Sequence, residues 1–318
     1  MSGDSSGPRG VLLLNMGGPD TLSAVRPFLF NLFSDRLIIK LGPSFLQKPL
    51  AMLISTLRAE KSRAMYALIG GGSPLGRITR EQAAALQDAL GGDFKVYVGM
   101  RYWHPFIEDT VREMVKDGVR SFTALSLYPH YSLATVGSAF VELNRVPGGL
   151  PIEHREVKSW PENPLYIEAL SASIREGFWG GVDGEKCRHV LFSAHGLPKY
   201  FIDRGDPYVD ELKKTISRIR ENIDAEVEFS LSYQSRSGPV KWLEPSTGDA
   251  IKRYAADGVK RLLIVPISFV SDHIETLYEI DILYRDMAMR RGIELRRVKA
   301  LNTHPLFIEA LKSLVVEG

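Results

Sequence analysis

The chain has 318 residues, of which 44% are hydrophobic and 25% are charged, and its formal net charge is +2. This composition is typical of a globular protein with two domains and a substantial core, and the near-neutral charge gives no sign of a nucleic-acid partner, so none is expected. One cysteine, Cys187, can neither close an internal disulfide nor supply a cluster of thiolates. Residues 1–10 lack the features of a signal peptide, and no apolar run is long enough to span a bilayer. We therefore expect a cytoplasmic protein.

Short apolar runs, which we interpret as buried strands, alternate with amphipathic segments along most of the chain. Strands that alternate with helices predict parallel sheets covered by helices on both faces, which is an α/β fold with right-handed crossovers. The expected strands are residues 11–15, 94–100, 122–127, 190–193, 227–232 and 261–267, and helical spacing is clear over 106–116 and 247–256.

Residues 21–66 do not follow this alternation. They are rich in large apolar side chains and contain seven Lys or Arg against two acids, Asp35 and Glu60, a local excess of five positive charges. One interpretation is a helical insertion packed on the first lobe. The other, equally supported, is a hydrophobic lip that touches a bilayer or an apolar ligand, because apolar surface beside basic charge suits a membrane interface.

The two halves of the chain resemble each other at their first strands. Residues 10–20 (GVLLLNMGGPD) match residues 189–199 (HVLFSAHGLPK), since both read as an apolar strand followed by a turn with Gly and Pro. This match aligns Met16 with His195.

A second pair of segments supports the same relation. Residues 117–140 and 257–280 both begin with Asp-Gly-Val and a basic residue, and both continue through a strand into a polar loop and a helix, which aligns Thr135 with Glu275. We infer two similar lobes, for which gene duplication and the common reuse of turn sequences in α/β folds are both explanations. Two such lobes enclose a cleft at the carboxyl ends of their strands.

His195 directly follows an expected strand, and Gly196 and Pro198 prevent a helix from starting at once. A side chain at this position points into the cleft of an α/β fold. Imidazole titrates near neutrality and binds divalent iron, so His195 is a candidate catalytic residue and metal ligand. From the local sequence alone, a histidine that only makes a hydrogen bond within a turn explains the position at least as well.

A row of acidic residues follows the last expected strand. Asp272, Glu275 and Glu279 have the spacing of one helical face. A capping box would explain Asp272 and Glu275 without a ligand but leaves Glu279 unexplained. Because like charges on one face repel, the row indicates contact with cations or transfer of protons, although a solvated face has the same pattern. His273 cannot share this face, and we expect it to orient a neighbour.

The strand ends of the first lobe have a different character. Arg101 stands beside Tyr102 and Trp103, where it could pair with a ligand carboxylate or belong to a packed aromatic turn. The Gly-rich segment 69–75 lacks the ending of a phosphate loop and suits a backbone that closes over a flat or bulky group. The loop that matches the acidic row is polar but uncharged, which suits a wall against a ligand; it contains Tyr131, Ser132, Thr135 and Ser138.

Taken together, these segments resemble the ferrochelatase family over roughly residues 10–310. Each motif is moderately specific, and their presence in this order is a strong match. The motifs are LLLNMGGPD (12–20), IGGGSPL (69–75), GMRYWHP (99–105), LYPHYS (127–132), FSAHGLP (192–198), GDPY (205–208), SYQSRSGPVKWLEP (232–245) and SFVSDHIETLYEID (268–281).

The resemblance implies a chelatase fold, with two Rossmann-like lobes and a porphyrin bound in the cleft between them. It implies that His195 and Glu275 are the catalytic and iron-binding pair, and that Asp272 and Glu279 form a route for protons or metal. The positions that contact the macrocycle in the family correspond to Met16, Arg101, Tyr102, Ser132 and Trp160.

The expected organisation has three parts. Residues 1–128 form the first lobe, with 21–66 as its insertion. Residues 129–302 form the second lobe and carry the metal site, and residues 303–318 form a C-terminal helix that packs back on the first lobe.

Two departures from the family bear on function. Some members hold a [2Fe-2S] cluster through cysteines of a C-terminal extension, and those cysteines are missing here, so no cofactor is expected and Fe²⁺ is a substrate. Members that use coproporphyrin have a tyrosine near the position of Met16, so the methionine favours protoporphyrin.

The expected activity is the insertion of Fe²⁺ into protoporphyrin IX, which yields protohaem and two protons. The alternatives are a coproporphyrin III ferrochelatase, a chelatase for cobalt or nickel and another tetrapyrrole, a non-catalytic carrier of porphyrin or metal, and a membrane-surface protein built on residues 21–66. The expected partners are a porphyrin and ferrous iron, with residues 21–66 as a candidate contact to the inner face of the membrane.

Overall fold

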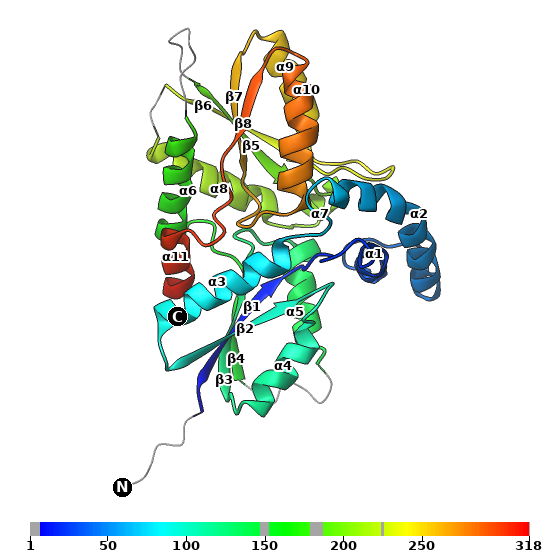
Figure 1. Cartoon of the computed structure of the whole chain (residues 1–318), viewed down its shortest axis with the longest axis vertical. Coiled ribbons are helices and arrows are strands. Elements are labelled where there is room, and N and C mark those ends of the chain that lie inside the picture. The colour runs from blue at the N-terminus through cyan, green and yellow to red at the C-terminus, as the bar shows by residue number, and fades with distance from the viewer. Residues whose placement is uncertain (1–6, 147–152, 179–186, 224–225, 318) are drawn as a thin grey trace. The chain divides into compact units, whose positions relative to one another are not determined.

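The computed structural model describes residues 7–146, 153–178, 187–223 and 226–317 (Figure 1). The chain divides into two compact units, the first made of residues 1–160 and 307–318 and the second of residues 161–306. Within the described residues each unit contains a four-stranded sheet in which every strand pair is parallel. The predicted α/β class is confirmed. No helix in these ranges combines the length and the apolar character that crossing a membrane requires.

The first unit has the strand order β2-β1-β3-β4. Its strands are β1 (Arg9–Asn15), β2 (Phe94–Met100), β3 (Ser121–Ser126) and β4 (Glu153–Val157). Its helices are α1 (Val25–Ser34), η1 (Ser44–Leu46), α2 (Gln47–Ala67), α3 (Leu75–Leu90), α4 (Ile107–Lys116), the π-helix η2 (Leu133–Gly137), α5 (Ser138–Leu143) and most of α11 (Pro305–Val316).

The second unit has the strand order β6-β5-β7-β8. Its strands are β5 (His189–His195), β6 (Glu228–Gln234), β7 (Arg261–Pro266) and β8 (Glu294–Arg297). Its helices are α6 (Pro164–Gly177), α7 (Lys199–Asp203), α8 (Tyr208–Glu221), α9 (Thr247–Ala256), the π-helix η3 (Glu275–Tyr284) and α10 (Arg285–Met289).

The two sheets share their topology and their register. In each unit, the strand that comes second along the chain lies at one edge of the sheet, and the first, third and fourth strands follow it across the sheet. Leu13 pairs with Leu125 in the first unit, and the residues that the sequence match aligns with them, Phe192 and Val265, pair in the second. A π-helix follows the third strand in each unit. The predicted similarity of two lobes is therefore confirmed at the level of single residue pairs.

The boundary between the units differs from the predicted one after residue 128. It lies after Trp160, because β4 pairs with β3 and so extends the first sheet. The C-terminal helix α11 belongs to the first unit from Phe307 onward. Arg155 of β4 donates to the carbonyl oxygens of Leu314 and Val315 in this helix, at 2.6 and 3.1 Å.

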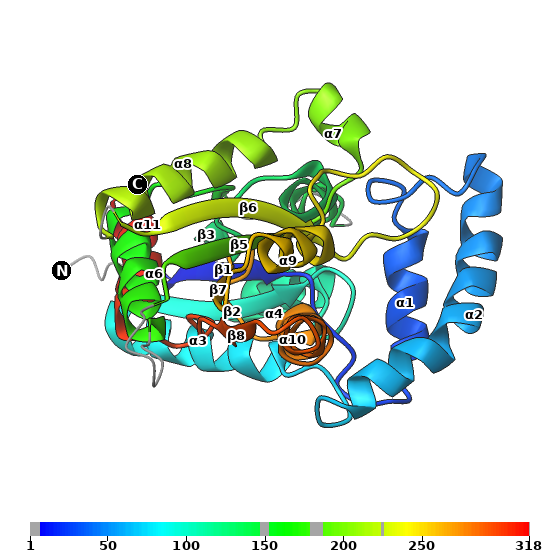
Figure 2. The same ribbon diagram turned by 90° about the horizontal axis from the view of Figure 1, so that it is seen from above.

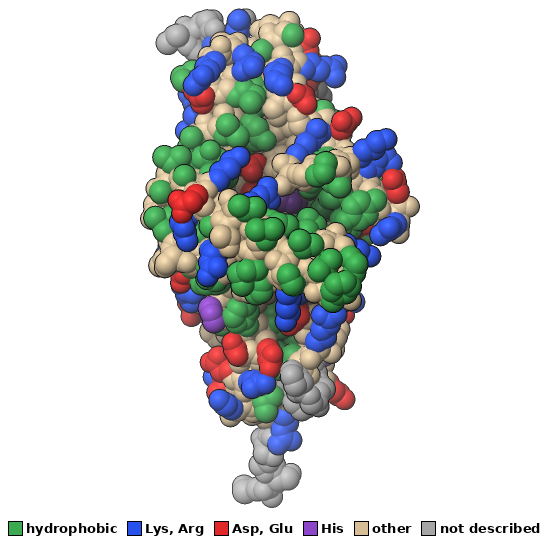
Figure 3. All heavy atoms as spheres, turned by 90° about the vertical axis from the view of Figure 1, so that its right-hand side faces the viewer, with side chains coloured by type: hydrophobic (Ala, Val, Ile, Leu, Met, Phe, Trp, Pro, Cys, Tyr) green, Lys and Arg blue, Asp and Glu red, His purple; other side chains and the backbone are tan. Residues whose placement is uncertain are grey.

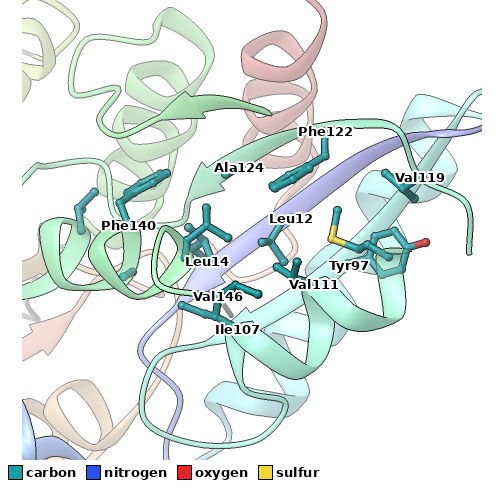
Figure 4. Packing of buried hydrophobic residues seen from close by; sticks show 14 residues of the cluster. Leu12, Leu14, Tyr97, Ile107, Val111, Val119, Phe122, Ala124, Phe140 and Val146 are labelled. Atoms are coloured by element: carbon teal, nitrogen blue, oxygen red, sulfur yellow. The ribbon is translucent and has the colours of Figure 1, made fainter. Parts of the chain in front are cut away.

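The core of the first unit lies between its sheet and the helices α4 and α5 (Figure 4). Alternate residues of β1 point to this face, so Leu12 and Leu14 pack against Ile107 and Val111 of α4. The strand is buried almost end to end, as expected for a parallel strand covered on both faces. The second unit has an equivalent core, in which Leu191 and Ile264 of its sheet meet Ile280 of η3.

Residues 21–66 form a helical insertion within the first unit. Helices α1 and α2 pack side by side, apart from the strands of that unit (Figures 1 and 2). The buried stripe of α2 is narrow and mostly small, with Ala51, Ser55 and Ala59 facing inward, whereas Leu53 and Leu57 are 55% and 72% exposed. This distribution is the reverse of the usual one, in which a helix buries its large apolar side chains.

Candidate active site

His195 is the last residue of β5, and its backbone is held from two sides. Its N–H donates to the hydroxyl of Ser268 at 3.2 Å, and its carbonyl accepts from the hydroxyl of Tyr208 at 3.1 Å. These two hydroxyls lie 2.6 Å apart. A β-carbon at the next residue, Gly196, would lie 2.6 Å from the carbonyl oxygen of Gln234. Only glycine therefore fits at residue 196, where the chain leaves β5, and this keeps His195 as the last residue of the strand.

The imidazole of His195 forms a pair with Glu275, the first residue of η3. Nδ1 lies 2.8 Å from Oε2 of the carboxylate, and 34% of the His195 side chain remains exposed against 14% of the Glu275 side chain. Within the described residues, Nε2 has no hydrogen-bond partner. A neutral imidazole that donates from Nδ1 carries its lone pair on Nε2. Nε2 is therefore the atom of this pair that can accept a proton or bind a metal.

Each member of the pair stabilises the charged form of the other. Burial on its own would raise the pKa of Glu275, but the charge and hydrogen bond of His195 outweigh it, so this pKa lies below its ordinary value. Burial on its own would lower the pKa of His195, whereas Glu275 raises it above its ordinary value. An imidazolium formed here is therefore balanced by a carboxylate within hydrogen-bond distance.

Glu279, one turn further along η3, has the opposite character. Burial and the neighbouring charge of Glu275 raise its pKa to about 7. The hydroxyl of Ser235 donates to this carboxylate, with both oxygens at 2.9 Å. Ser235 has a φ of 64°, in the left-handed region that costs a non-glycine residue some energy, so the loop after β6 is held in place to make this contact. A carboxyl with a pKa near neutrality can both take up and release a proton.

His273 is buried beside the pair. Its Nδ1 donates to the carbonyl oxygen of Ser271 at 3.1 Å, and its ring packs edge-on against Phe269, with centroids 4.1 Å apart. Burial lowers its pKa, which favours the neutral ring. Its Nε2 lies 4.0 Å from Oε1 of Glu275, too far for a hydrogen bond, and has no partner among the described residues. The expectation that His273 orients a neighbour stays a prediction.

The predicted row of three acids on one helical face is wrong for Asp272. This residue precedes η3, and its carboxylate accepts from Arg297 at 2.9 Å, from Thr276 at 2.9 Å and from Asn302 at 3.0 Å. The capping box, which was the alternative explanation for Asp272 and Glu275, is also absent, since Asp272 does not cap the helix. Asp272 is thus tied to β8 and the segment that follows it, and only Glu275 and Glu279 remain as neighbours along η3.

The residues described by the structure contain no group of three or more His, Cys, Asp or Glu side chains placed to hold a metal ion. The site instead offers one imidazole and one carboxylate at hydrogen-bond distance. Such a pair can serve as a weak metal site or as a base with its charge partner.

In the first unit, Arg101 and Tyr102 belong to a buried hydrogen-bond network around Asp35. The carboxylate of Asp35 accepts from Arg101 at 3.0 Å and from the Tyr102 hydroxyl at 2.8 Å, and it also bonds the hydroxyl of Ser138. Arg101 makes a further contact with Glu142 at 3.5 Å. Tyr102 is only 3% exposed, so these residues join the insertion to the strand end of β2.

The other three predicted macrocycle contacts differ in exposure. Met16 is partly exposed at the end of β1. Ser132 is buried and accepts from the backbone N–H of Ala134 at the start of η2. Trp160 is buried, and its indole N–H donates to the carbonyl oxygen of Ser126 at 2.8 Å. Met16 therefore has the most surface of the three to offer a ligand.

Sequence reasoning missed polar residues in each of the two units. Tyr208 and Ser268, which hold the His195 backbone, carry no local signal beyond their places in the GDPY and SFVSDHIETLYEID motifs. Asp35 had a signal, because it is one of two acids in a basic segment. An isolated acid among cations that becomes buried must find a partner, and here the partner is Arg101.

Solved structures identify the class of fold. The chain is similar to the sirohydrochlorin chelatase SirB from Bacillus subtilis subspecies spizizenii in complex with cobalt, with a TM-score of 0.55 and 11% identity over 98% of this chain and 94% of that one. It is also similar to SirB from Bacillus subtilis with Fe³⁺, with a TM-score of 0.57 and 12% identity over 98% of this chain and 96% of that one. The fold is therefore that of the chelatases.

Sequence comparison identifies the family. The ferrochelatase family model matches residues 8–318. Proteins named ferrochelatase are 52% identical in Synechococcus sp. (strain JA-2-3B'a(2-13)), covering 96% of this chain and 91% of that protein, and 50% identical in Gloeobacter violaceus, covering 97% of each. The ferrochelatase of Gloeothece citriformis is 48% identical over 97% of this chain and 82% of that protein. The chain belongs to the ferrochelatase family and is a metal chelatase, a lyase.

Proposed function

We propose that this protein inserts Fe²⁺ into protoporphyrin IX at the His195–Glu275 pair, producing protohaem and two protons. The observation that carries the proposal is the 2.8 Å contact between the imidazole and the carboxylate at the carboxyl end of β5, with the imidazole still one-third exposed. The reaction needs a base near neutrality and a counter-charge for the protonated base, and this pair supplies both.

In this proposal Nε2 of His195 accepts one pyrrole proton. The hydrogen bond from Nδ1 to Glu275 keeps the lone pair on Nε2 before the transfer and stabilises the imidazolium afterwards. Glu279, with a pKa of about 7, takes up the second proton and releases it to solvent. Asp272 has no place in this proton route, because its oxygens accept from three fixed donors.

The ferrous ion is a substrate in this scheme and must leave the protein with the porphyrin. One imidazole and one carboxylate give it few ligands, and four pyrrole nitrogens in a plane can compete for it successfully. Nε2 of His195 cannot contact Fe²⁺ and accept a pyrrole proton at the same moment. In this proposal the two steps therefore follow one another.

No [2Fe-2S] cofactor takes part in the proposal. Such a cluster needs four ligands that are mostly thiolates, and this chain has one cysteine, Cys187, which is buried. An iron and sulfide assay of the purified protein, together with its visible spectrum, checks this expectation.

The preference for protoporphyrin IX rests on Met16, the partly exposed residue at the end of β1. A thioether offers an adaptable apolar contact, whereas family members that use coproporphyrin carry a tyrosine near this position. The experiment is an anaerobic absorbance assay with Fe²⁺ that offers protoporphyrin IX and coproporphyrin III in parallel. We expect turnover with protoporphyrin and a lower kcat/KM with coproporphyrin.

The outcomes separate the levels of the proposal. A higher kcat/KM with coproporphyrin III overturns the substrate assignment and leaves iron insertion intact. Binding without turnover for both porphyrins overturns the function. The variant Met16→Tyr is expected to shift the ratio towards coproporphyrin III, and an unchanged ratio excludes this residue as the determinant.

We also propose that the outer face of η1 and α2 rests on the inner surface of the cytoplasmic membrane. Phe45, Leu53 and Leu57 are 75%, 55% and 72% exposed, and Lys48 and Arg58 are exposed among them. Figure 3 looks onto the side of the molecule where α1 and α2 lie and shows hydrophobic side chains gathered there with Lys and Arg between them. Apolar groups that can enter a lipid interface beside cations that attract anionic headgroups favour such a surface.

Vesicle sedimentation tests this surface. The triple variant Phe45→Ser, Leu53→Ser, Leu57→Ser should lose binding to vesicles that contain anionic lipid. A matched control replaces three exposed apolar residues elsewhere, Val115, Met289 and Val316, with Ser and should bind like the parent. Phe28 and Phe33 are unsuitable targets because they are only 4% and 8% exposed. A parent protein that does not sediment with vesicles overturns the membrane proposal.

A further inference from the structure

Arg297 ends β8, the edge strand of the second sheet, and its guanidinium is almost fully enclosed, with 10% of the side chain exposed. It forms a fork with Asp281 of η3, with Nε to Oδ1 at 3.0 Å and Nη2 to Oδ2 at 2.7 Å. Its third nitrogen, Nη1, donates to Asp272 at 2.9 Å. A single arginine therefore binds two carboxylates, one before η3 and one within it.

These two carboxylates flank Glu275. Asp272 lies three residues before it and Asp281 six residues after it. Asp272 is held further by the side chains of Thr276 and Asn302, at 2.9 and 3.0 Å. The backbone N–H of Asp272 donates to Asn302 as well, at 3.0 Å. The segment is thus attached to the edge strand of the sheet on both sides of Glu275.

The sheet connects this anchor to His195. Arg297 is in register with Ile264 of β7, and Ile264 is in register with Leu191 of β5, the strand that ends at His195. The position of Glu275 relative to His195 therefore depends on how η3 is attached to the sheet. Gln234 of β6 also contributes, because its side-chain amide donates to the carbonyl oxygen of Glu275 at 3.2 Å and to its Oε2 at 3.4 Å. Helix η3 itself contacts the sheet through apolar side chains such as Ile280, and apolar packing is non-directional. It does not by itself set a carboxylate oxygen 2.8 Å from an imidazole nitrogen.

We infer that Arg297 is a positioning residue of the active site: it anchors the chain on both sides of Glu275, so that Glu275 stays within hydrogen-bond distance of His195. The inference rests on the proposed role of the His195–Glu275 pair. It assigns Asp272 the role of an anchor, since its carboxylate accepts from three donors and is not free to carry protons.

The chemistry of the contacts calls for arginine. The guanidinium presents several N–H groups in a fixed plane, which permits a two-bond fork to one carboxylate and a further bond to another. Lysine has one ammonium at the end of a flexible chain and cannot reproduce this geometry. The neighbouring Arg296 provides a matched control, because it lies on the same strand, has a side chain that is 51% exposed, and bonds the nearby Glu294.

The test compares Arg297→Gln, Arg297→Lys and the control Arg296→Gln in the full chain. For Arg297→Gln we expect kcat for iron insertion to fall about tenfold or more, while the KM for porphyrin stays within about twofold, because the lost interaction orients a catalytic group and contacts no substrate. Arg297→Lys should fall between this variant and the parent, and Arg296→Gln should match the parent.

A spectroscopic readout follows the positioning directly. The proton shared by His195 Nδ1 and Glu275 should give a downfield signal in ¹⁵N-histidine NMR spectra, assigned by its absence from His195→Ala. We expect Arg297→Gln to lose or broaden this signal while its circular dichroism stays that of the parent. This measurement is made without iron or porphyrin, so it tests the positioning even if the parent inserts no iron, an outcome that would overturn the proposed function instead.

A double variant separates the anchor from a proton carrier. If Arg297 and Asp272 act as one unit, then Arg297→Gln with Asp272→Asn should lower kcat no more than the larger single effect, whereas independent roles multiply. A folded Arg297→Gln with parental kcat, or with reduced kcat and an intact His195–Glu275 signal, overturns the inference. If Arg297→Gln fails to fold, Asp281→Asn and Arg297→Lys decide the matter, and parental kcat in both overturns it.

Discussion

In the first unit β1 leads into Met16, and in the second unit the equivalent strand β5 ends at His195. Both strands have the same neighbours in the same register. After the third strand of each sheet comes a π-helix, which carries Thr135 in the first unit and Glu275 in the second. The backbone scaffold is therefore repeated, while the proposed acid–base pair, His195 with Glu275, belongs to the second unit.

The two units also use buried carboxylates differently. Asp35 in the first unit accepts from Arg101, Tyr102 and the backbone N–H of Leu37, and its side chain is 5% exposed. Glu275 in the second unit is paired with an imidazole that is partly open. A carboxylate paired with a guanidinium, which is always protonated, can only hold structure together. A carboxylate paired with an imidazole can take part in proton transfer. The difference lies in the partner rather than in the acid.

The largest effect should come from exchanging the equivalent strand-end residues for alanine. His195→Ala should lower kcat by about 10²–10⁴-fold, because it removes the general base, and should leave porphyrin binding largely unchanged. Met16→Ala at the matching position should alter the KM for porphyrin more than kcat. The two variants are compared by anaerobic steady-state assays and by porphyrin fluorescence titration. Full activity in a folded His195→Ala protein would remove the proposed difference between the units.

The next largest effect should come from breaking the buried ion pair of the first unit, Asp35 with Arg101, and it should appear in the free energy of unfolding. Asp35→Ala leaves the guanidinium of Arg101 enclosed without its main counter-charge and should cost about 3 kcal/mol or more of unfolding free energy. The control is Asp117→Ala, which removes an aspartate that also binds a cation, Lys95, and a tyrosine hydroxyl, Tyr97, but lies at the surface. Urea unfolding measures both variants. Equal losses of unfolding free energy in the two variants would show that the burial of the Asp35 pair does not increase the cost of breaking it.

Glu279 should make the stability of the protein depend on pH. Its pKa in the folded state, about 7, is raised from an ordinary value of 4.5, so its protonated form favours folding below pH 4.5 and that contribution is lost as the pH rises through 7. Glu279→Gln should therefore be more stable than the parent at pH 8, by about 3 kcal/mol, and the difference should shrink towards pH 4–5.

Thermal unfolding of both proteins between pH 4.5 and pH 8 measures this effect. Glu176→Gln, which changes an exposed glutamate at the end of α6, controls for the removal of one charge. The groups that face Glu279 are Glu275 and His195, whose charges act on it in opposite directions, and the hydroxyl of Ser235. A stability difference that is constant across this pH range would mean that Glu279 titrates normally.

Much of this comparison could be predicted from the sequence. The strand 94–100 and the helix 247–256 have the predicted bounds, because a mostly apolar run and a 3.6-residue period are clear markers of a strand and a helix. The alignment of Met16 with His195 agrees with the strand register. It was readable because β1 and β5 lie inside their sheets and are buried on both faces, which leaves little freedom in their residue types.

The missed features have a common cause. The edge strands β4 and β8 read EHREV and ELRR, because an edge strand meets solvent and needs no apolar run. The anchoring of Asp272 by Arg297 joins residues 25 positions apart, and no local period reveals such a pair. Polar contacts between distant segments depend on side-chain geometry, which hydrophobic patterning does not encode.

The smallest predicted effect concerns the backbone of His195 and compares two tyrosines of the second unit. Tyr208→Phe removes the hydroxyl that bonds the His195 carbonyl and Ser268. It should cost about 1 kcal/mol of stability and lower kcat by roughly threefold, because the histidine gains freedom without losing its carboxylate partner. Tyr254→Phe removes a hydroxyl bonded to Ser230 at 2.6 Å, in a strand-to-helix contact that does not involve His195.

The two tyrosine variants should therefore lose similar stability, while only Tyr208→Phe loses activity. Urea unfolding and steady-state iron insertion are measured on the same preparations. If both variants keep full kcat, the hydrogen bond from Tyr208 to the carbonyl of His195 is only structural, and the orientation of His195 does not depend on it. If both lose activity in proportion to stability, the active site responds to the general stability of the second unit. The hydrogen bond from Tyr208 to His195 then has no separate role in keeping His195 beside Glu275.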